Sequence, residues 1–210
     1  MKYVKLVLLW LLAAVMLCGC GAELNQEEIT GTWIGTGTHK KEVATVLLNQ
    51  IELYKEEKDF IDLYSLQYVK SVRFTKNGKY AITWSVEENK RCVQEFYEGV
   101  MDTLYENRVR LNELYEPVFD DMSREEFNQF YVDMYGFENY ETMINAFVEN
   151  AYDYEQMAQT KEIGTYKIDE SVLVCTIDGA EEGDVLGCKV EGDTLTLIYA
   201  SSREVYTRAE

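Results

Sequence analysis

Apolar and polar residues alternate in two blocks of this chain, and a stretch with helical periodicity separates the blocks. The clearest alternation flanks Asn77-Gly78, with Phe74 before the turn and Trp84 after it. An Asn-Gly pair tolerates the positive φ angles that a tight hairpin needs. The pattern therefore predicts an antiparallel pair of strands over residues 67–75 and 79–86, with one face buried.

Six further segments are predicted to be strands, because their apolar residues alternate and polar or glycine-containing turns bound most of them. They cover residues 31–36, 164–169, 171–177, 184–190, 193–200 and 204–208. Together with the hairpin they make eight strands, a number that closes into a small barrel or folds as a sandwich. Closure would remove the exposed edges of the sheet.

Helical periodicity occupies residues 87–160. Capping boxes that begin at Ser85 and Ser123 mark the starts of two helices, and Asn139 can cap a third. The sequence therefore predicts an α+β fold in which a three-helix insertion lies between strands 3 and 4. A further helix is predicted over residues 41–54, although part of it also suits a strand, and the charged run that follows is predicted to be a solvated break.

The predicted insertion is rich in aromatic residues, with six of the eight phenylalanines and eight of the 16 tyrosines. An aromatic stripe on its helices is most simply core, and its functional alternative is the wall of an apolar pocket. The stripe consists of Phe96, Tyr97, Phe127, Phe130, Tyr131, Tyr140 and Phe147.

The N-terminal segment has the features of a secretory signal peptide. A short basic start precedes twelve apolar residues, 6–17, whereas a membrane-spanning helix needs about 20. Leu17-Cys18-Gly19-Cys20 resembles the lipobox, the bacterial motif at which the signal peptide is removed before a cysteine that becomes diacylated. The resemblance implies that Cys20 is the lipidated first residue of a protein held on the extracytoplasmic face of the cell membrane. Ordinary secretion is the alternative.

Short motifs in the predicted strands extend the resemblance. They are Gly31-Thr32-Trp33, a Phe-x-x-x-Gly-x-Tyr pattern from Phe74 to Tyr80, Gly-Thr-Tyr-x-Ile from Gly164 to Ile168, and Gly-Asp-Thr-Leu-Thr-Leu from Gly192 to Leu197. In these motifs the chain is similar to the lipocalin-like domain of Gram-positive bacterial lipoproteins, which often carry helices between the third and fourth strands. The resemblance implies an eight-stranded up-and-down barrel and the binding of an apolar ligand. It carries over no catalytic residue.

These features predict four parts of the chain. A signal peptide covers residues 1–19, and the lipidated cysteine with a polar tether covers 20–30. A lipocalin-like β domain covers 31–86 and 161–210, and the helical insertion between its two halves covers 87–160.

Charge excludes some classes of function. The formal charge of the chain is −18, which argues against nucleic-acid binding and against the chain lying flat on anionic lipid. An acyl anchor would therefore have to hold the protein on the membrane. Residues 87–160 hold 18 acidic and 5 basic residues, so a basic protein is a candidate partner for the insertion.

No group of residues predicts catalysis. The only histidine, His39, lies in a polar turn and is expected to be exposed, and Asp120-Asp121 lacks the loop pattern of a calcium site. We therefore predict a protein that is not an enzyme and that needs no metal or cofactor. Cys92 is predicted to be a packing residue rather than a nucleophile, because no histidine is near it in sequence.

Cys175 and Cys188 lie on two neighbouring predicted strands and are candidates for a disulfide bond. If residues 178–183 turn a hairpin, the two cysteines lie opposite one another, at a separation that a disulfide can span. Two buried free thiols are the alternative, and we favour it.

The sequence supports two hypotheses of function. In the first, the β domain binds a small apolar or amphipathic ligand and the helical insertion acts as a lid. The predicted ligand-binding residues are Trp33, Phe74, Ile82, Trp84, Leu195 and Leu197. In the second, the acidic insertion binds a protein partner or has a structural role in the envelope, and the β domain is a scaffold. A barrel interior filled by those six side chains would argue against the first hypothesis.

Overall fold

The computed structural model describes residues 24–112, 114–115, 119–169, 172–199 and 202–209 of the chain, and contacts divide the chain into two compact units. The β unit comprises the chain up to Thr36, Lys70–Trp84 and the chain from Thr160 onward. The helical unit comprises Gly37–Val69 and Ser85–Gln159, so the segment between the first two strands belongs with the helices. The predicted signal peptide and Cys20 lie outside the described residues.

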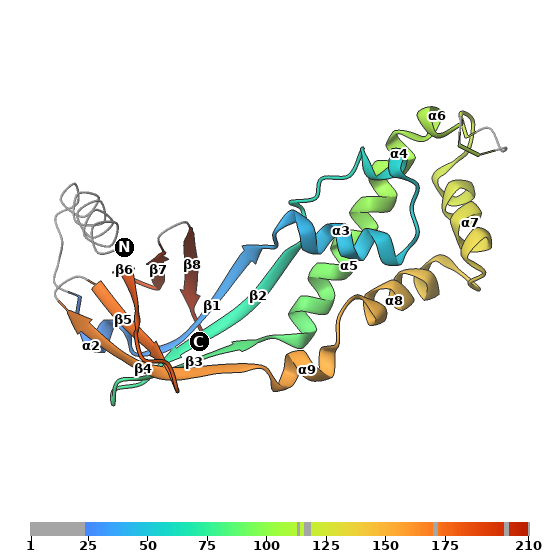
Figure 1. Ribbon diagram of the computed structural model, residues 1–210. Coiled ribbons are helices and arrows are strands. Elements are labelled where there is room, and N and C mark those ends of the chain that lie inside the picture. Colours follow the sequence, from blue (N-terminus) through green and yellow to red (C-terminus); the bar gives the residue numbers. More distant parts are fainter. Residues whose placement is uncertain (1–23, 113, 116–118, 170–171, 200–201, 210) are drawn as a thin grey trace. The chain divides into compact units, whose positions relative to one another are not determined.

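Eight antiparallel strands form a closed barrel in which neighbours in the sheet are also neighbours in the sequence (Figure 1). The strands are β1 (Gly31–Thr38), β2 (Gln67–Phe74), β3 (Lys79–Trp84), β4 (Lys161–Asp169), β5 (Val172–Ile177), β6 (Asp184–Glu191), β7 (Thr194–Ile198) and β8 (Arg203–Arg208). Pairing of β8 with β1 closes the barrel. The predicted eight-stranded α+β fold is confirmed, and of the two alternatives the sheet is the barrel rather than the sandwich.

The hairpin around Asn77-Gly78 is confirmed. Phe74 pairs with Tyr80 across it, and Gly78 has a φ of +74°, a conformation that glycine adopts without strain. On the neighbouring strand, the backbone amide of Tyr166 donates to the carbonyl of Gly78 at 2.8 Å. The turn is therefore held both by its own strands and by β4.

Inward-facing side chains fill the barrel. The buried cluster consists of Ile29, Trp33, Val72, Phe74, Tyr80, Tyr166, Leu173, Cys175, Leu186, Leu195, Leu197 and Tyr206. Gly35 is required in this packing, because a Cβ atom there would lie 2.5 Å from the ring of Tyr206. The alternation that predicted the strands thus also predicts which face is buried.

One end of the barrel is covered by a short helix that the sequence pattern did not predict. Residues 26–29, predicted to be part of a polar tether, form α2 (Gln26–Ile29), which Asn25 caps by accepting a hydrogen bond from the amide of Glu27. Ile29 is fully buried in the barrel cluster. A single apolar residue at the end of a polar segment is too little periodicity to predict a helix.

The helical unit contains α3 (Lys41–Gln50), α4 (Lys55–Lys58), α5 (Val86–Glu106), α6 (Arg108–Leu111), α7 (Arg124–Tyr135), α8 (Tyr140–Ala151) and α9 (Tyr154–Gln159) (Figure 1). The prediction of three helices between strands 3 and 4 is incomplete, because five described helices lie between β3 and β4 in the sequence. The two additional helices, α6 and α9, have four and six residues, too short for a periodic signal.

The predicted caps have different outcomes. Ser123 and Asn139 accept hydrogen bonds from backbone amides at the starts of α7 and α8, as predicted. Ser85 precedes α5 but makes no side-chain cap. Instead, the side chain of Asn89 bonds back to the carbonyl of Ser85 at 2.7 Å. None of the helices in the described part of the chain is long and apolar enough to span a membrane.

Candidate functional site

The barrel interior is occupied by most of the predicted ligand-binding residues. Trp33 and Leu195 are fully buried, and Phe74 and Leu197 are 2% exposed, all within one packed cluster. Ile82 packs against this cluster at its edge, and Trp84 is half-buried at the end of β3. None of the six lines the pocket beside α2, the groove over β3 and β4 or the pocket against the helical core. They are brought together as core, an arrangement that argues against a ligand between them in the barrel interior, and their role in binding a ligand stays a prediction.

Helix α2 is fastened to the covered end of the barrel by Trp33 and Arg208. The indole nitrogen of Trp33 donates to the carbonyl of Ile29 at 2.8 Å. The guanidinium of Arg208 donates to the carbonyls of Glu28 and Thr30 at 2.7 and 3.0 Å, and it lies 4.0 Å from the centre of the Trp33 ring. These contacts satisfy carbonyl groups at the end of a helix that is too short to be stable alone.

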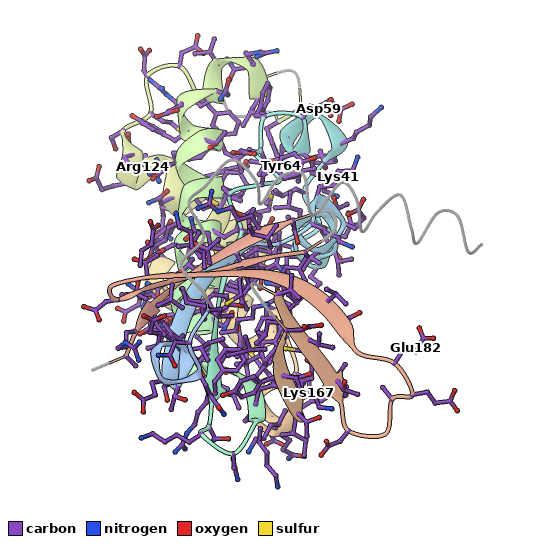
Figure 2. The ribbon with its side chains drawn as sticks, turned by 90° about the vertical axis from the view of Figure 1, so that its left-hand side faces the viewer. Lys41, Asp59, Tyr64, Arg124, Lys167 and Glu182 are labelled. Atoms are coloured by element: carbon purple, nitrogen blue, oxygen red, sulfur yellow. The ribbon has the colours of Figure 1, made fainter. Side chains whose placement is uncertain are left out.

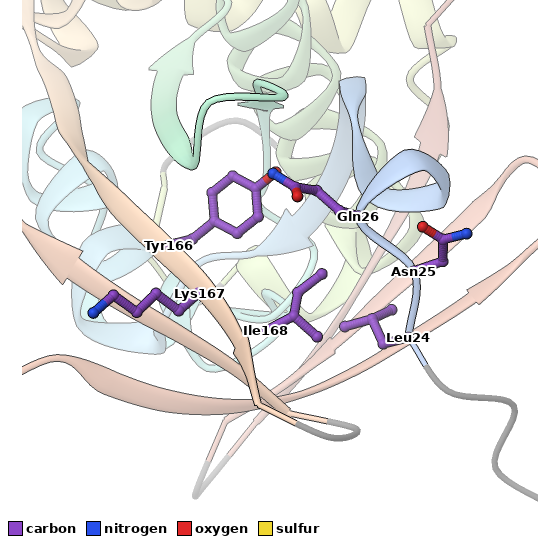
Figure 3. Close-up of a pocket in the computed structure, with 6 residues that line it drawn as sticks. All are labelled: Leu24, Asn25, Gln26, Tyr166, Lys167 and Ile168. Carbon is purple, nitrogen blue, oxygen red and sulfur yellow. The ribbon is translucent and has the colours of Figure 1, made fainter.

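A pocket of about 700 Å³ lies at the covered end, between α2 and β4. Leu24, Asn25 and Gln26 line it from the segment that leads into α2, and Tyr166, Lys167 and Ile168 line it from β4. In Figure 3 the side chains of Leu24 and Ile168 approach one another, whereas Lys167 extends away from them. Lys167, which is labelled in Figure 2, is exposed.

The pocket presents an apolar side and an amide side. Leu24 and Ile168 are half-buried, so both offer apolar surface to a bound group. The amide nitrogen of Gln26 already donates to the carbonyl of Lys76 at 2.8 Å, and the hydroxyl of Tyr166 donates to the carbonyl of Thr75 at 2.8 Å. The amide oxygen of Gln26 and the amide nitrogen of Asn25 form no hydrogen bond with another described residue.

An ion pair lies inside the opposite end of the barrel. Lys70 donates to the carboxylate of Glu204 at 2.8 Å, and the hydroxyl of Tyr206 donates to its second oxygen at 2.6 Å. Burial by itself raises the pKa of Glu204, but the hydrogen bonds from Lys70 and Tyr206 outweigh it, so that pKa is lowered. Lys70, Glu204 and Tyr206 therefore satisfy one another as partly buried polar groups at this end.

The helical unit has its own aromatic core, in which the predicted stripe is largely buried. Phe96, Tyr97, Phe127, Tyr131 and Phe147 are core residues, and Phe130 and Tyr140 pack against them. A smaller pocket of about 270 Å³ lies against this core, lined in part by Tyr97, Tyr135 and Phe147. The stripe is thus primarily core, and the prediction that the insertion is a lid stays a prediction.

Glu57 is buried within that core, contrary to the prediction that the charged run 55–59 is a solvated break. Its carboxylate accepts hydrogen bonds from the hydroxyls of Tyr115 and Tyr131 at 2.8 and 2.6 Å, and from the amide of Tyr54 at 2.6 Å. Burial, followed by the charge of Glu57, raises the pKa of Tyr131. A buried carboxylate is tolerated here because its neighbours satisfy it.

The two barrel cysteines do not face one another. Cys175 pairs with Asp184, and Leu173 pairs with Leu186, so the hairpin turns about two residues earlier than the sequence pattern indicated. Cys188 is offset from Cys175 by about four residues along the strands, or roughly 13 Å. All three described cysteines are free, and burial raises the pKa of Cys175 to about 12. The register therefore rules out the disulfide, in favour of the free thiols.

His39 is half-buried rather than exposed. Its ring lies between Tyr68 and Tyr152, with ring centres 4.9 and 6.0 Å away, and its Nε2 is 3.4 Å from the hydroxyl of Tyr152. Burial lowers the pKa of His39. Among the residues that the structure describes, no three His, Cys, Asp or Glu side chains are grouped so that they could hold a metal ion.

The residues of the covered-end pocket were not predicted as a site. The available signal was Asn25, which precedes Glu27, Glu28 and the apolar Ile29 as a helix cap would. That signal indicates a helix start but does not say that the helix lies across a barrel end. No protein-family model, curated protein or solved structure matches the chain.

Proposed function

We propose that this chain is a membrane-anchored extracytoplasmic lipoprotein whose barrel binds a small amphipathic ligand in the pocket between α2 and β4. The observation that carries the binding proposal is the pocket itself, with two aliphatic side chains beside two amides at one end of a barrel that is otherwise packed. Small-molecule sites combine apolar walls with a few placed polar groups, and mouths of barrels are common places for them. No catalytic step is part of the proposal.

The anchoring part of the proposal rests on the sequence alone. The Leu17-Cys18-Gly19-Cys20 segment supports diacylation of Cys20. Mass spectrometry of the N-terminal peptide from a bacterial membrane fraction tests it: a diacylated Cys20 is expected, and an unmodified N-terminus elsewhere in the chain would contradict it. A Cys20→Ser variant cannot be acylated at this position, so it should no longer be found in the membrane fraction.

A matched pair of variants tests the ligand pocket. The fluorescent amphiphile anilinonaphthalenesulfonate is titrated into the wild-type protein, Ile168→Asp and Val205→Asp. Val205 is on the outer face of β8, is 46% exposed and lines none of the three pockets described above. We expect Ile168→Asp to raise the Kd for the probe at least about tenfold, because a carboxylate replaces apolar wall. Val205→Asp should leave the Kd unchanged, and equal effects of the two variants would contradict the proposal.

A protein-binding role for the helical unit is a second candidate. Residues 37–69 and 85–159 hold 24 acidic and 9 basic residues, a formal charge of −15, so most of the negative charge of the chain belongs to this unit. A basic partner would be captured strongly at low salt and weakly at high salt. Capture that does not depend on salt would argue against this role.

A further inference from the structure

One region of the β unit has the opposite charge to the rest of the chain. Residues 70–84, which contain part of β2, the hairpin turn and β3, hold four basic and no acidic residues, although the chain as a whole has a formal charge of −18. Lys70 faces into the barrel and pairs with Glu204. The other cations of this segment belong to the outer surface or to the turn.

Strand register places three cations on one outer face. Arg73 of β2 pairs with Ala81 of β3, and Ala81 pairs with Ile163 of β4. Lys79 and Lys161 occupy the neighbouring rows of the same face, opposite Thr165 and Thr83. The small side chain of Ala81 lies in the middle, and a groove of about 620 Å³ runs over these residues. We call this surface, defined by Arg73, Lys79, Ala81, Lys161 and Ile163, the cationic face.

Within the described part of the chain, no acidic side chain forms an ion pair with the cationic face. Arg73, Lys79 and Lys161 are exposed, and their side chains form no ion pair with another described residue. Ile163 adds an apolar side chain that is 44% exposed. The groove is also lined by the carboxylate of Asp178. Its three cationic side chains still outnumber this single carboxylate.

The N-terminal segment leaves the barrel beside this face. The side chain of Gln26 donates to the carbonyl of Lys76 in the β2–β3 turn at 2.8 Å, so the start of the described chain lies at the same turn as Lys79. Residues 21–23 alone separate Leu24 from Cys20. Even fully extended, this connection spans only about 15 Å. A lipid on Cys20 would therefore hold the turn close to the membrane surface.

We propose that the cationic face binds anionic phospholipid headgroups of the membrane to which the chain is anchored. This inference rests on the anchor in the proposed function. A basic side chain near an anionic surface strengthens binding by about fivefold, so three acting together give about a hundredfold. Exposed Ile163 can insert between headgroups, while the acidic helical unit is repelled by the same lipids. The net negative charge argues against the whole chain lying flat, but the cationic face carries the complementary charge.

Lysine footprinting on vesicles tests this proposal without natural lipidation. Residues 21–210 with an N-terminal hexahistidine tag in place of Cys20 are held on vesicles that contain nickel-chelating lipid, since all described contacts lie within the retained residues. The vesicles are otherwise phosphatidylcholine, with or without phosphatidylglycerol. The acetylation rate of each lysine by an N-hydroxysuccinimide ester is then read by mass spectrometry. Failure of lipidation in cells would leave this result intact, so the two proposals are tested separately.

We expect phosphatidylglycerol to slow acetylation of Lys79 and Lys161 at least about threefold, and high salt to abolish the protection. Exposed Lys40, Lys41 and Lys55 of the helical unit should react equally on both vesicles. Arg73→Glu should weaken the protection, whereas Arg91→Glu, which changes the charge equally on α5, should not. The proposal would be overturned if Lys79 and Lys161 were each acetylated at the same rate with and without phosphatidylglycerol in the vesicles. So would protection that develops with protein concentration in the absence of vesicles, because it would indicate a second copy as the occupant.

Discussion

At the scale of single residues, Glu57 joins three segments of the helical unit. The hydroxyls of Tyr115 and Tyr131 and the amide of Tyr54 all donate to its carboxylate. Each of these donors would lose its partner if the side chain were shortened. A buried donor without an acceptor costs about 1–3 kcal/mol, which makes this residue more important than an average acidic side chain.

We expect Glu57→Ala to lower the free energy of unfolding by about 3–5 kcal/mol, because it leaves the buried hydroxyl of Tyr131 and the half-buried hydroxyl of Tyr115 without their acceptor and opens a cavity. Urea unfolding followed by tyrosine and tryptophan fluorescence measures the change. Glu56→Ala, at the exposed neighbouring position, should change stability by less than about 0.5 kcal/mol. Similar effects of the two variants would show that the network contributes little.

His39 gives the stability of the helical unit a pH dependence. Burial lowers its pKa, so in the range just below pH 6.5 the unfolded chain binds a proton that the folded chain does not. Stability contributed in this way is present above the unfolded pKa and falls as the pH decreases below it. Because carboxylates also titrate at lower pH, the useful quantity is the difference between wild type and His39→Gln.

We expect the stability of the wild type, measured relative to His39→Gln by urea unfolding, to fall between about pH 7.5 and about pH 5.5. Nuclear magnetic resonance titration of the single imidazole should give a pKa below 6.5 for the folded protein. A wild-type protein that gains stability relative to the variant on acidification would contradict the burial of this ring.

The apolar or polar character of single residues predicts which side chains form the barrel core, but it does not predict which residues line the pocket between α2 and β4. Alternation predicts that Trp33, Phe74, Leu195 and Leu197 lie on the inward faces of strands. The same apolar character makes these side chains pack against one another. Whether an interior is hollow depends on how side chains fit together in three dimensions, which alternation along the sequence does not contain. Ile168, in contrast, lines the pocket because the segment that leads into α2 lies beside β4.

At the scale of elements, α2 determines what the covered end of the barrel presents. It has only four residues, and its position depends on Ile29 in the core and on Arg208 at its carbonyls. Strands with a long alternating pattern were predictable, as were α7 and α8 with their caps. Short elements such as α2 and α4 depend on contacts with residues distant in sequence, so local periodicity does not reveal them.

We expect Arg208→Ala to loosen α2, because the carbonyls of Glu28 and Thr30 lose charged donors and Trp33 loses the stacked guanidinium. Hydrogen exchange at the amides of Ile29 and Thr30 should accelerate at least about tenfold. Arg203→Ala, an exposed position at the other end of the same strand, should leave these rates unchanged. No acceleration in Arg208→Ala would mean that Ile29 and the hydrogen bond from Trp33 hold the helix without Arg208.

At the scale of the whole molecule, the chain combines the β unit and the helical unit, which differ in charge. Most of the negative charge lies in Gly37–Val69 and Ser85–Gln159, whereas the outer surface of β2 to β4 is positive. The sequence predicted the acidic insertion but not the cationic face, because that face appears only when register aligns Arg73, Lys79 and Lys161. Its lysines are 82 residues apart in the chain, and only strand pairing brings them together.

Native mass spectrometry of the protein released from the membrane fraction of a bacterial host tests the central claim most directly. We predict a reproducible additional mass on residues 21–210 that organic solvent extracts, that Ile168→Asp loses and that Val205→Asp retains. The pocket between α2 and β4 would then be the site of a bound amphiphile. A protein that carries no additional mass, or one that both variants retain equally, would contradict ligand binding in that pocket.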